Sequence, residues 1–292
     1  MIQVINTEVD NIEELPDGSV IQHGKYNDRI YLIKRGSGSS SELVIALKNL
    51  SHDKGYSKIF AKVKLVDLQE FIDHGFVIEA FIPKYFAGGE DLFMVCFYSG
   101  IERLIDTKHE DQDLIVTLAQ SKVNSQNNSN KKSDNRSGIN FRKCNPKDIP
   151  LMVSIYKSVF PTYPFPINES DYLLKTMKNN VDYYCAEDGG KIVALSSSEI
   201  DYSSKSSEMT DFATLPIYRG AGLARQLLNM MEKETAKKNI KTFYTIARAK
   251  SAGMNIIFAG NGYRYGGRLK NNTNISGQIE SMNVWYKTVG LI

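Results

Sequence analysis

One short stretch of the chain combines residues that could bind a phosphate group. It reads Arg219-Gly220-Ala221-Gly222-Leu223-Ala224-Arg225, and it joins a predicted strand that begins near Glu208 to a predicted helix with apolar residues at helical spacing. The first N–H groups of a helix have no partners within the helix, and the macrodipole places about half a positive charge there. Gly220 and Gly222 lack a Cβ, so a phosphate could approach the backbone closely. The stretch therefore predicts an anion site at the start of a helix.

The spacing of the glycines distinguishes between the known classes of phosphate-binding turn. The turn is too short for the G-x-x-x-x-G-K-[ST] loop, and it differs from the G-x-G-x-x-G dinucleotide fingerprint. The order R-x-x-G-x-A, from Arg219 to Ala224, resembles instead the pyrophosphate-binding motif of the GCN5-related N-acetyltransferases, which bind acetyl-CoA. The resemblance implies an α/β (α+β) fold with a mixed central sheet flanked by helices. A glycine-rich turn without a ligand is the alternative.

Composition and charge exclude several other classes of protein. The 292 residues are 42% hydrophobic and 24% charged with a formal net charge of +3, which is typical of a soluble globular protein rather than of a nucleic-acid binder. No apolar run approaches the length of a membrane span, and the first residues do not resemble a signal peptide. The cysteines and histidines show no metal-ligand spacing and no disulfide framework. We expect a cytoplasmic protein without a metal.

A polar stretch divides the chain into two predicted domains. Residues 1–123 show the order strand, helix, strand, helix, strand, strand and a trailing helix, which predicts a smaller, degenerate acetyltransferase-like α/β domain. Its own glycine turn, Arg35-Gly36-Ser37-Gly38, is interpreted as an ordinary turn rather than a phosphate site. Residues 124–138 contain no apolar side chain and predict a flexible linker. Residues 139–292 carry the order of a complete acetyltransferase domain, with seven strands and four helices.

The end of the chain carries a more specific resemblance. The segment A-K-S-A-G-M-N-I-I-F-A-G-N-G-Y-R-Y-G-G-R from Ala249, together with T-D-F-A-T from Thr210, is similar to the β-lysine N6-acetyltransferases. The segments Y-S-K-I-F-A-K-V at Tyr56 and E-A-F-I-P-K-Y-F at Glu79 resemble the leading domain of that family. The resemblance implies acetylation of the terminal amine of β-lysine, which yields an osmolyte, with acetyl-CoA as cosubstrate. Alternatives are acetylation of a polyamine, of lysine or of a protein tail, and a non-catalytic acyl-CoA-binding module.

Amine acetylation requires a proton acceptor, because a lysine-type ammonium has a pKa near 10.4. Glu208 occupies the position of the general-base glutamate in many members of the family. Asp211, on the same strand but with opposite parity, is the competing candidate. The resemblance also implies a set of acetyl-CoA contacts. A backbone N–H near Ala213 or Thr214 would polarise the thioester carbonyl, and the turn would bind the pyrophosphate through Arg219, Gly220, Ala221, Gly222, Leu223, Ala224 and Arg225.

Two positions depart from the family pattern. The family usually has Asn at the position of Ser251 and Tyr at the position of Phe258, and the resemblance implies that both positions lie near the cosubstrate. Phe258 has no proton to give, so the group that protonates the thiolate stays unassigned.

A pocket for β-lysine needs a cation for the carboxylate, an anion for the 3-ammonium group and apolar walls. The cation candidates are Arg248, Arg264 and Arg268, and the anion candidates are Glu280 and Asp211. Tyr163 and Phe165 are expected to form a wall, and the last β-turn offers Asn271, Asn272 and Asn274. We expect a small-molecule amine as partner and neither nucleic acid nor membrane, while the sequence leaves a homodimer open.

Overall fold

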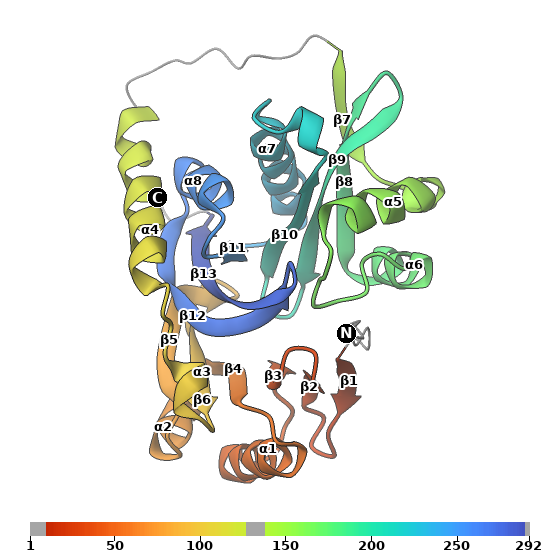
Figure 1. Ribbon diagram of the computed structural model, residues 1–292. Coiled ribbons are helices and arrows are strands. Elements are labelled where there is room, and N and C mark those ends of the chain that lie inside the picture. The colour runs from red at the N-terminus through yellow and green to blue at the C-terminus, as the bar shows by residue number, and fades with distance from the viewer. Residues whose placement is uncertain (1–9, 127–137, 290–292) are drawn as a thin grey trace, which may run out of the picture.

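The computed structural model describes residues 10–126 and 138–289 (Figure 1). The strands of these residues form a single 13-stranded sheet in the order β1-β2-β3-β4-β6-β5-β12-β13-β11-β10-β9-β8-β7. The predicted linker lies outside the described residues except at its ends, and residues 124–126 belong to a helix instead. The division into two domains stays a prediction, because one continuous sheet passes through both parts of the chain.

The first half of the chain contains the following elements: β1 (Asn11–Glu14), β2 (Val20–Gly24), β3 (Arg29–Lys34), α1 (Ser40–Lys54), β4 (Lys58–Lys64), α2 (Leu65–Asp73), β5 (Val77–Phe86), β6 (Glu90–Tyr98), α3 (Ile101–Leu104) and α4 (His109–Gln126). The second half contains β7 (Ile139–Lys143), α5 (Ile149–Val159), α6 (Ser170–Asn179), β8 (Val181–Asp188), β9 (Lys191–Asp201), β10 (Ser206–Thr214), α7 (Leu223–Ala236), β11 (Thr242–Arg248), α8 (Ala252–Gly260), β12 (Arg264–Ile275) and β13 (Gln278–Thr288). Sequence patterning misses β1 because its side chains are all exposed and show no alternation.

The two halves share one strand order. In the first half β3 runs parallel to β4, β4 pairs antiparallel with β6, and β6 pairs antiparallel with β5. In the second half β10 runs parallel to β11, β11 pairs antiparallel with β13, and β13 pairs antiparallel with β12. The helix α1 follows β3 as α7 follows β10. The first half therefore repeats the topology of the second from β8 onward.

The two halves meet at the equivalent strands β5 and β12, where two glycines allow a close backbone approach. Gly267 is opposite Ala80, and a Cβ on Gly267 would lie 2.2 Å from the carbonyl oxygen of Glu79. A Cβ on Gly266 would lie 2.7 Å from the carbonyl oxygen of Phe81. Side chains at these two positions would separate the strands, so glycine is required for the joined sheet.

The faces of the sheet are covered differently in the two halves. In the first half α1 and α2 cover one face, and the other face packs against the second half through Tyr31, Phe60 and Tyr85. In the second half α7 and α8 cover one face, and α5 and α6 cover the other (Figure 1). The helix α4 lies beside α8, and its residues Val116 and Ala119 join the core beneath α7 and α8. The helix predicted to trail the first domain thus packs onto the second half.

Candidate active site

A cavity of about 1820 Å³ is lined by residues of both halves. The second half contributes the glycine turn, the start of α7, β10, β11 and the start of α8. The first half contributes residues of β3, β4 and β5, among them Tyr31, Lys62 and Tyr85. The segment with Tyr163 and Phe165 closes one wall, and the side-chain amide of Gln22 donates to the carbonyl oxygen of Pro164 at 3.0 Å.

The glycine turn presents an open helix start to this cavity. Gly220 and Gly222 have φ angles of 81° and 74°, in the left-handed region that favours glycine. Gly222 is the N-cap of α7, and no side chain caps the helix there. A Cβ on either glycine would have no atom within 4 Å. All seven residues from Arg219 to Arg225 line the cavity, so the first N–H groups of α7 face open space.

The strands β10 and β11 separate next to this turn. They pair only from Ser206 to Glu208, after which the edge of β10 that faces β11 has no strand partner. The N–H of Leu215 donates to Val193 of β9 at 3.0 Å, so by strand alternation the N–H of Thr214 points to the gap. Thr214 lines the cavity, whereas Ala213 is buried in the core beside α5. Of the two predicted thioester contacts, Thr214 is the one at the cavity wall.

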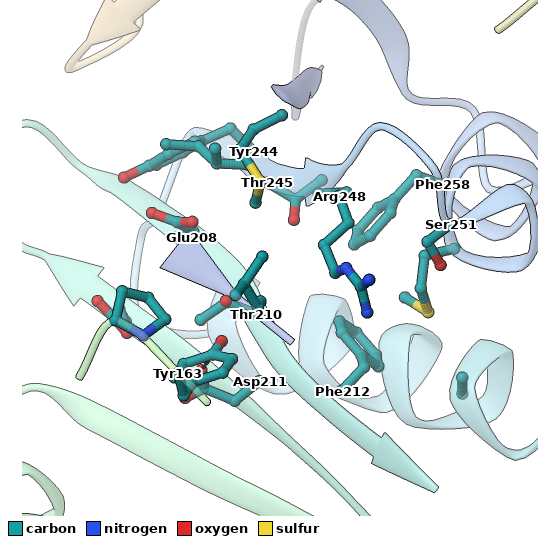
Figure 2. Close-up of a pocket in the computed structure, with 18 of the residues that line it drawn as sticks. Tyr163, Glu208, Thr210, Asp211, Phe212, Tyr244, Thr245, Arg248, Ser251 and Phe258 are labelled. Atoms are coloured by element: carbon teal, nitrogen blue, oxygen red, sulfur yellow. Dashed lines mark hydrogen bonds between the residues drawn. The ribbon is translucent and has the colours of Figure 1, made fainter. Parts of the chain in front are cut away.

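Glu208 and Asp211 both line the cavity (Figure 2). Regular alternation along β10 would place them on opposite faces of the sheet. A bulge between Thr210 and Ala213 interrupts the alternation, and Asp211 has a φ of 55°. The opposite parity expected from the sequence therefore does not separate the two side chains.

The two carboxylates differ in how firmly they are held. Asp211 accepts hydrogen bonds from the Tyr163 hydroxyl at 2.6 Å and from the Ser197 hydroxyl at 2.6 Å, so both of its oxygens are occupied. Burial raises the pKa of Asp211, and these hydrogen bonds partly oppose the rise. Burial also raises the pKa of Glu208, opposed by the Lys62 cation and by a hydrogen bond from Tyr244. Hydroxyl groups thus hold both oxygens of Asp211, whereas Glu208 interacts with the Tyr244 hydroxyl, the Ile246 backbone and the Lys62 cation.

The cation beside Glu208 belongs to the first half of the chain. Lys62 of β4 donates to the Tyr244 hydroxyl at 2.9 Å, and its ammonium lies 5.5 Å from the ring centre of Tyr31. Burial would lower the pKa of Lys62, but Tyr31, Tyr85 and Glu208 raise it above the usual value. Lys62 thus stays charged at the end of the cavity that Glu208 lines. Lys62 was not predicted as a site residue, although the lysines among the apolar residues from Lys58 to Lys64 were a signal.

A third carboxylate at this end was also missed. Glu199 of β9 is opposite Glu208 in the register of β9 and β10, and it lines the cavity. Burial raises the pKa of Glu199, and the neighbouring Asp211 and Glu208 add to the rise. Three carboxylates therefore share one end of the cavity, which favours a positively charged acceptor.

Several predicted substrate residues bind protein partners instead. Glu280 accepts two hydrogen bonds from Arg248, both at 2.9 Å. Arg268 pairs with Asp113 at 2.8 Å. The Asn274 amide donates to the carbonyl oxygen of Tyr26 at 2.9 Å. Of the predicted residues, the cavity brings together Tyr163, Phe165, Arg248, Asn272, Ser251 and Phe258, whereas Arg264, Arg268, Asn271, Asn274 and Glu280 do not line it.

Comparisons with known proteins identify the family. Residues 152–254 match the Acetyltransferase (GNAT) family. The chain is 39% identical to Beta-lysine N(6)-acetyltransferase of Methanococcus maripaludis over 96% of its own length and 99% of the relative's. The chain belongs to the GNAT family of acetyltransferases. It is therefore an acetyl-CoA-dependent N-acetyltransferase, and the family and fold class predicted from the glycine turn are confirmed.

Two further relatives extend over most of the chain. N-acetyltransferase YodP of Bacillus subtilis is 32% identical over 92% of this chain and 95% of its own. Beta-lysine N(6)-acetyltransferase of Methanosarcina mazei is 32% identical over 85% of this chain and 97% of its own. The similarity thus includes the first half, which lies outside the matched family segment.

The described ranges contain neither a metal-binding group of His, Cys, Asp and Glu side chains nor a membrane-crossing helix. Within residues 10–126 and 138–289, His, Cys, Asp and Glu side chains form no group of three or more that could hold a metal ion. The helices of these ranges are all too short or too polar to cross a membrane.

Proposed function

We propose that this enzyme transfers the acetyl group of acetyl-CoA to the terminal amine of β-lysine. The observation that carries the proposal is one cavity with an open anion site at one end and three carboxylates at the other. The anion site suits a pyrophosphate, and the three carboxylates suit a diamine. The 39% identity to a Beta-lysine N(6)-acetyltransferase over nearly the whole chain supports the same acceptor.

The second half is proposed to bind acetyl-CoA. The N–H groups of the turn from Gly220 to Ala224 would bind the pyrophosphate, and Arg219 and Arg225 would add positive charge. The pantetheine would lie in the gap between β10 and β11, where the N–H of Thr214 could polarise the thioester carbonyl. Ser251 and Phe258 line the same part of the cavity and would contact the cosubstrate.

Glu208 is proposed as the general base. It would accept a proton from the terminal ammonium of the acceptor, directly or through a water molecule. The neutral amine would then attack the thioester carbon, a C–N bond would form, and the C–S bond would break. The attacking nitrogen would carry a second proton after the bond forms, and this proton would pass through a water molecule to the departing thiolate, because Phe258 has none to donate. Asp211, held by Tyr163 and Ser197, would attract the cationic acceptor and keep the wall in place.

A thiol-release assay tests this function with β-lysine, α-lysine and spermidine offered side by side. We expect the highest kcat/KM with β-lysine and acetylation at its terminal nitrogen, which mass spectrometry of the product can locate. A preference for spermidine would contradict the proposed acceptor. Binding of acetyl-CoA without turnover of any of the three would contradict small-amine acetylation and favour a binding module.

A further inference from the structure

Arg29 of β3 is a buried cation in the wall of the cavity. Its exposed fraction is 4%, and alternate residues of β3, namely Arg29, Tyr31 and Ile33, line the cavity. One guanidinium nitrogen of Arg29 donates to the carbonyl oxygen of Asn272 at 2.7 Å and to the hydroxyl of Thr273 at 3.0 Å. Its Nε is buried and has no hydrogen-bond partner among the described residues.

Arg29 has no carboxylate within 4.0 Å of its guanidinium in the described ranges. Other arginines with restricted exposure have a carboxylate within 4.0 Å: Arg35, Arg103, Arg142, Arg248 and Arg268. The carboxylate of Asp10 acts on Arg29 from farther away, and its two oxygens accept hydrogen bonds from Tyr26 and Asn27. Burial lowers the pKa of Arg29 to about 10, so it stays charged at neutral pH. A buried and unpaired charge is unfavourable unless an anion joins it.

Asn272, whose backbone carbonyl accepts from Arg29, also carries an unpaired acceptor. The side-chain oxygen of Asn272 is buried without a donor, and Asn272 lines the same cavity. The Asn272 side-chain nitrogen donates to Thr273 at 3.2 Å, which fixes the orientation of the amide. A free N–H donor on a cation beside a free carbonyl acceptor is the complement of a carboxylate beside an ammonium group.

We propose that Arg29 and Asn272 together bind the amino-carboxylate end of the acceptor. The Arg29 guanidinium would hold the carboxylate, and the Asn272 side-chain oxygen would accept a hydrogen bond from the 3-ammonium group. The inference rests on the proposed function and gives the first half of the chain a role in it. The first half would select acceptors that carry a carboxylate, and polyamines would be excluded because they leave Arg29 unpaired.

The test compares β-lysine with 1,4-diaminopentane, which keeps both amines at the same spacing but lacks the carboxylate. The wild type should prefer β-lysine. Arg29→Met should lower kcat/KM for β-lysine by roughly 10- to 100-fold more than kcat/KM for the diamine. Arg29→Lys keeps the charge but loses the planar fork, so it should retain part of the preference. Turnover of the diamine by each variant also shows that the variant is folded.

A matched control removes a cation outside the cavity. Lys25 donates to the carbonyl oxygen of Gly55 and is exposed, so Lys25→Met should keep the wild-type preference. Equal losses for both acceptors in Arg29→Met would assign Arg29 a structural role and overturn this inference, while the proposed function would stand. Failure of the wild type to acetylate β-lysine would overturn the proposed function, and this inference with it.

A second measurement needs no substitution. 3-Aminohexanoate keeps the carboxylate and the 3-amine but lacks the reacting amine. It should inhibit the wild type competitively against β-lysine. 3-Aminohexanamide keeps the 3-ammonium group but has a neutral amide in place of the carboxylate, so it should inhibit at least about tenfold more weakly. Equal inhibition by the two compounds would overturn the carboxylate subsite.

Discussion

The two halves of the sheet share a topology, but only one keeps an open glycine turn. In the second half Gly220 and Gly222 border open space. In the first half the equivalent turn is filled by protein: a Cβ on Gly36 would lie 2.0 Å from the carbonyl oxygen of Asp17. The N–H of Gly36 donates to the Ser19 hydroxyl at 2.8 Å, and the N–H of Ser37 donates to Asp17 at 3.0 Å.

The two turns also differ in the charged groups that surround them. In the first half Arg35 bonds to the carbonyl oxygen of Gly38 and pairs with Asp67 at 3.1 Å, and Ser40 at the start of α1 donates to Asp67 at 2.6 Å. A carboxylate thus already occupies the region where the second half has room for an anion. The strand positions differ as well, because Tyr31 takes the place in the β3–β4 register that Glu208 takes in the β10–β11 register. The same topology therefore provides the proposed cosubstrate site in the second half and part of the cavity wall in the first half.

Glu208→Gln should have the largest effect on turnover, because only the second half has a carboxylate at this register position. The change removes the proton acceptor but keeps the side-chain size, so kcat should fall by roughly 10²- to 10⁴-fold. Steady-state kinetics with β-lysine measures the effect, and Asp211→Asn is the matched comparison. A larger loss in Asp211→Asn than in Glu208→Gln would reverse the assignment of the base.

Gly222→Val should weaken the binding of acetyl-CoA. A β-branched residue is strained at a φ of 74° and would block the start of α7. We expect kcat/KM for acetyl-CoA to fall by roughly 10- to 100-fold, as expected when hydrogen bonds to a charged group are lost. An unchanged KM for acetyl-CoA would show that the turn does not bind the pyrophosphate.

Lys62→Met tests whether the first half tunes the base. The Lys62 cation opposes the rise in the pKa of Glu208, so its removal should raise that pKa further. Because Glu208 must be ionised to accept a proton, the acid limb of the kcat/KM profile should move to higher pH. Lys62→Arg keeps the charge and should keep the limb near its wild-type position. An acid limb that does not move in Lys62→Met would show that Lys62 does not influence the pKa of Glu208.

Gly36→Ala should have the smallest effect on catalysis and should act on stability instead. The added methyl group would overlap Asp17, which should reduce the free energy of unfolding by about 1–3 kcal/mol. The KM for acetyl-CoA should stay near the wild-type value. Gly100→Ala is the control, because a Cβ there has no atom within 4 Å and the φ of Gly100 is −139°. Thermal unfolding and steady-state kinetics on both variants separate stability from binding.

The parts that sequence reasoning predicted are those that local patterns determine. The turn from Arg219 to Arg225 needs only glycine at positive φ and a helix start, so its motif identified the family. From β3 onward the strand and helix order, apart from the short helix α3, followed from alternation and helical spacing, whereas β1 and β2 were missed. The interpretation of the first glycine turn as an ordinary turn stays a prediction, and the structure shows N–H groups of this turn donating to Ser19 and Asp17.

The parts that were missed depend on contacts between distant segments. The bulge at Asp211 has no marker in the sequence, and it changes which face the side chain occupies. Arg268 and Glu280 were predicted to bind substrate because the sequence does not reveal their ion-pair partners. In the fold they pair with Asp113 and Arg248. Arg29 and Lys62 enter the cavity only because the first half packs against the second, which a single strand pattern cannot reveal.

The most direct test of the account is the number of CoA molecules that one chain binds. Isothermal titration of the wild type with CoA should give one site per chain, and Gly222→Val should weaken that site by roughly 10- to 100-fold. One site that depends on Gly222 would agree with a cosubstrate site in the second half and a filled turn in the first. Two sites per chain, or one site that Gly222→Val leaves intact, would contradict the account.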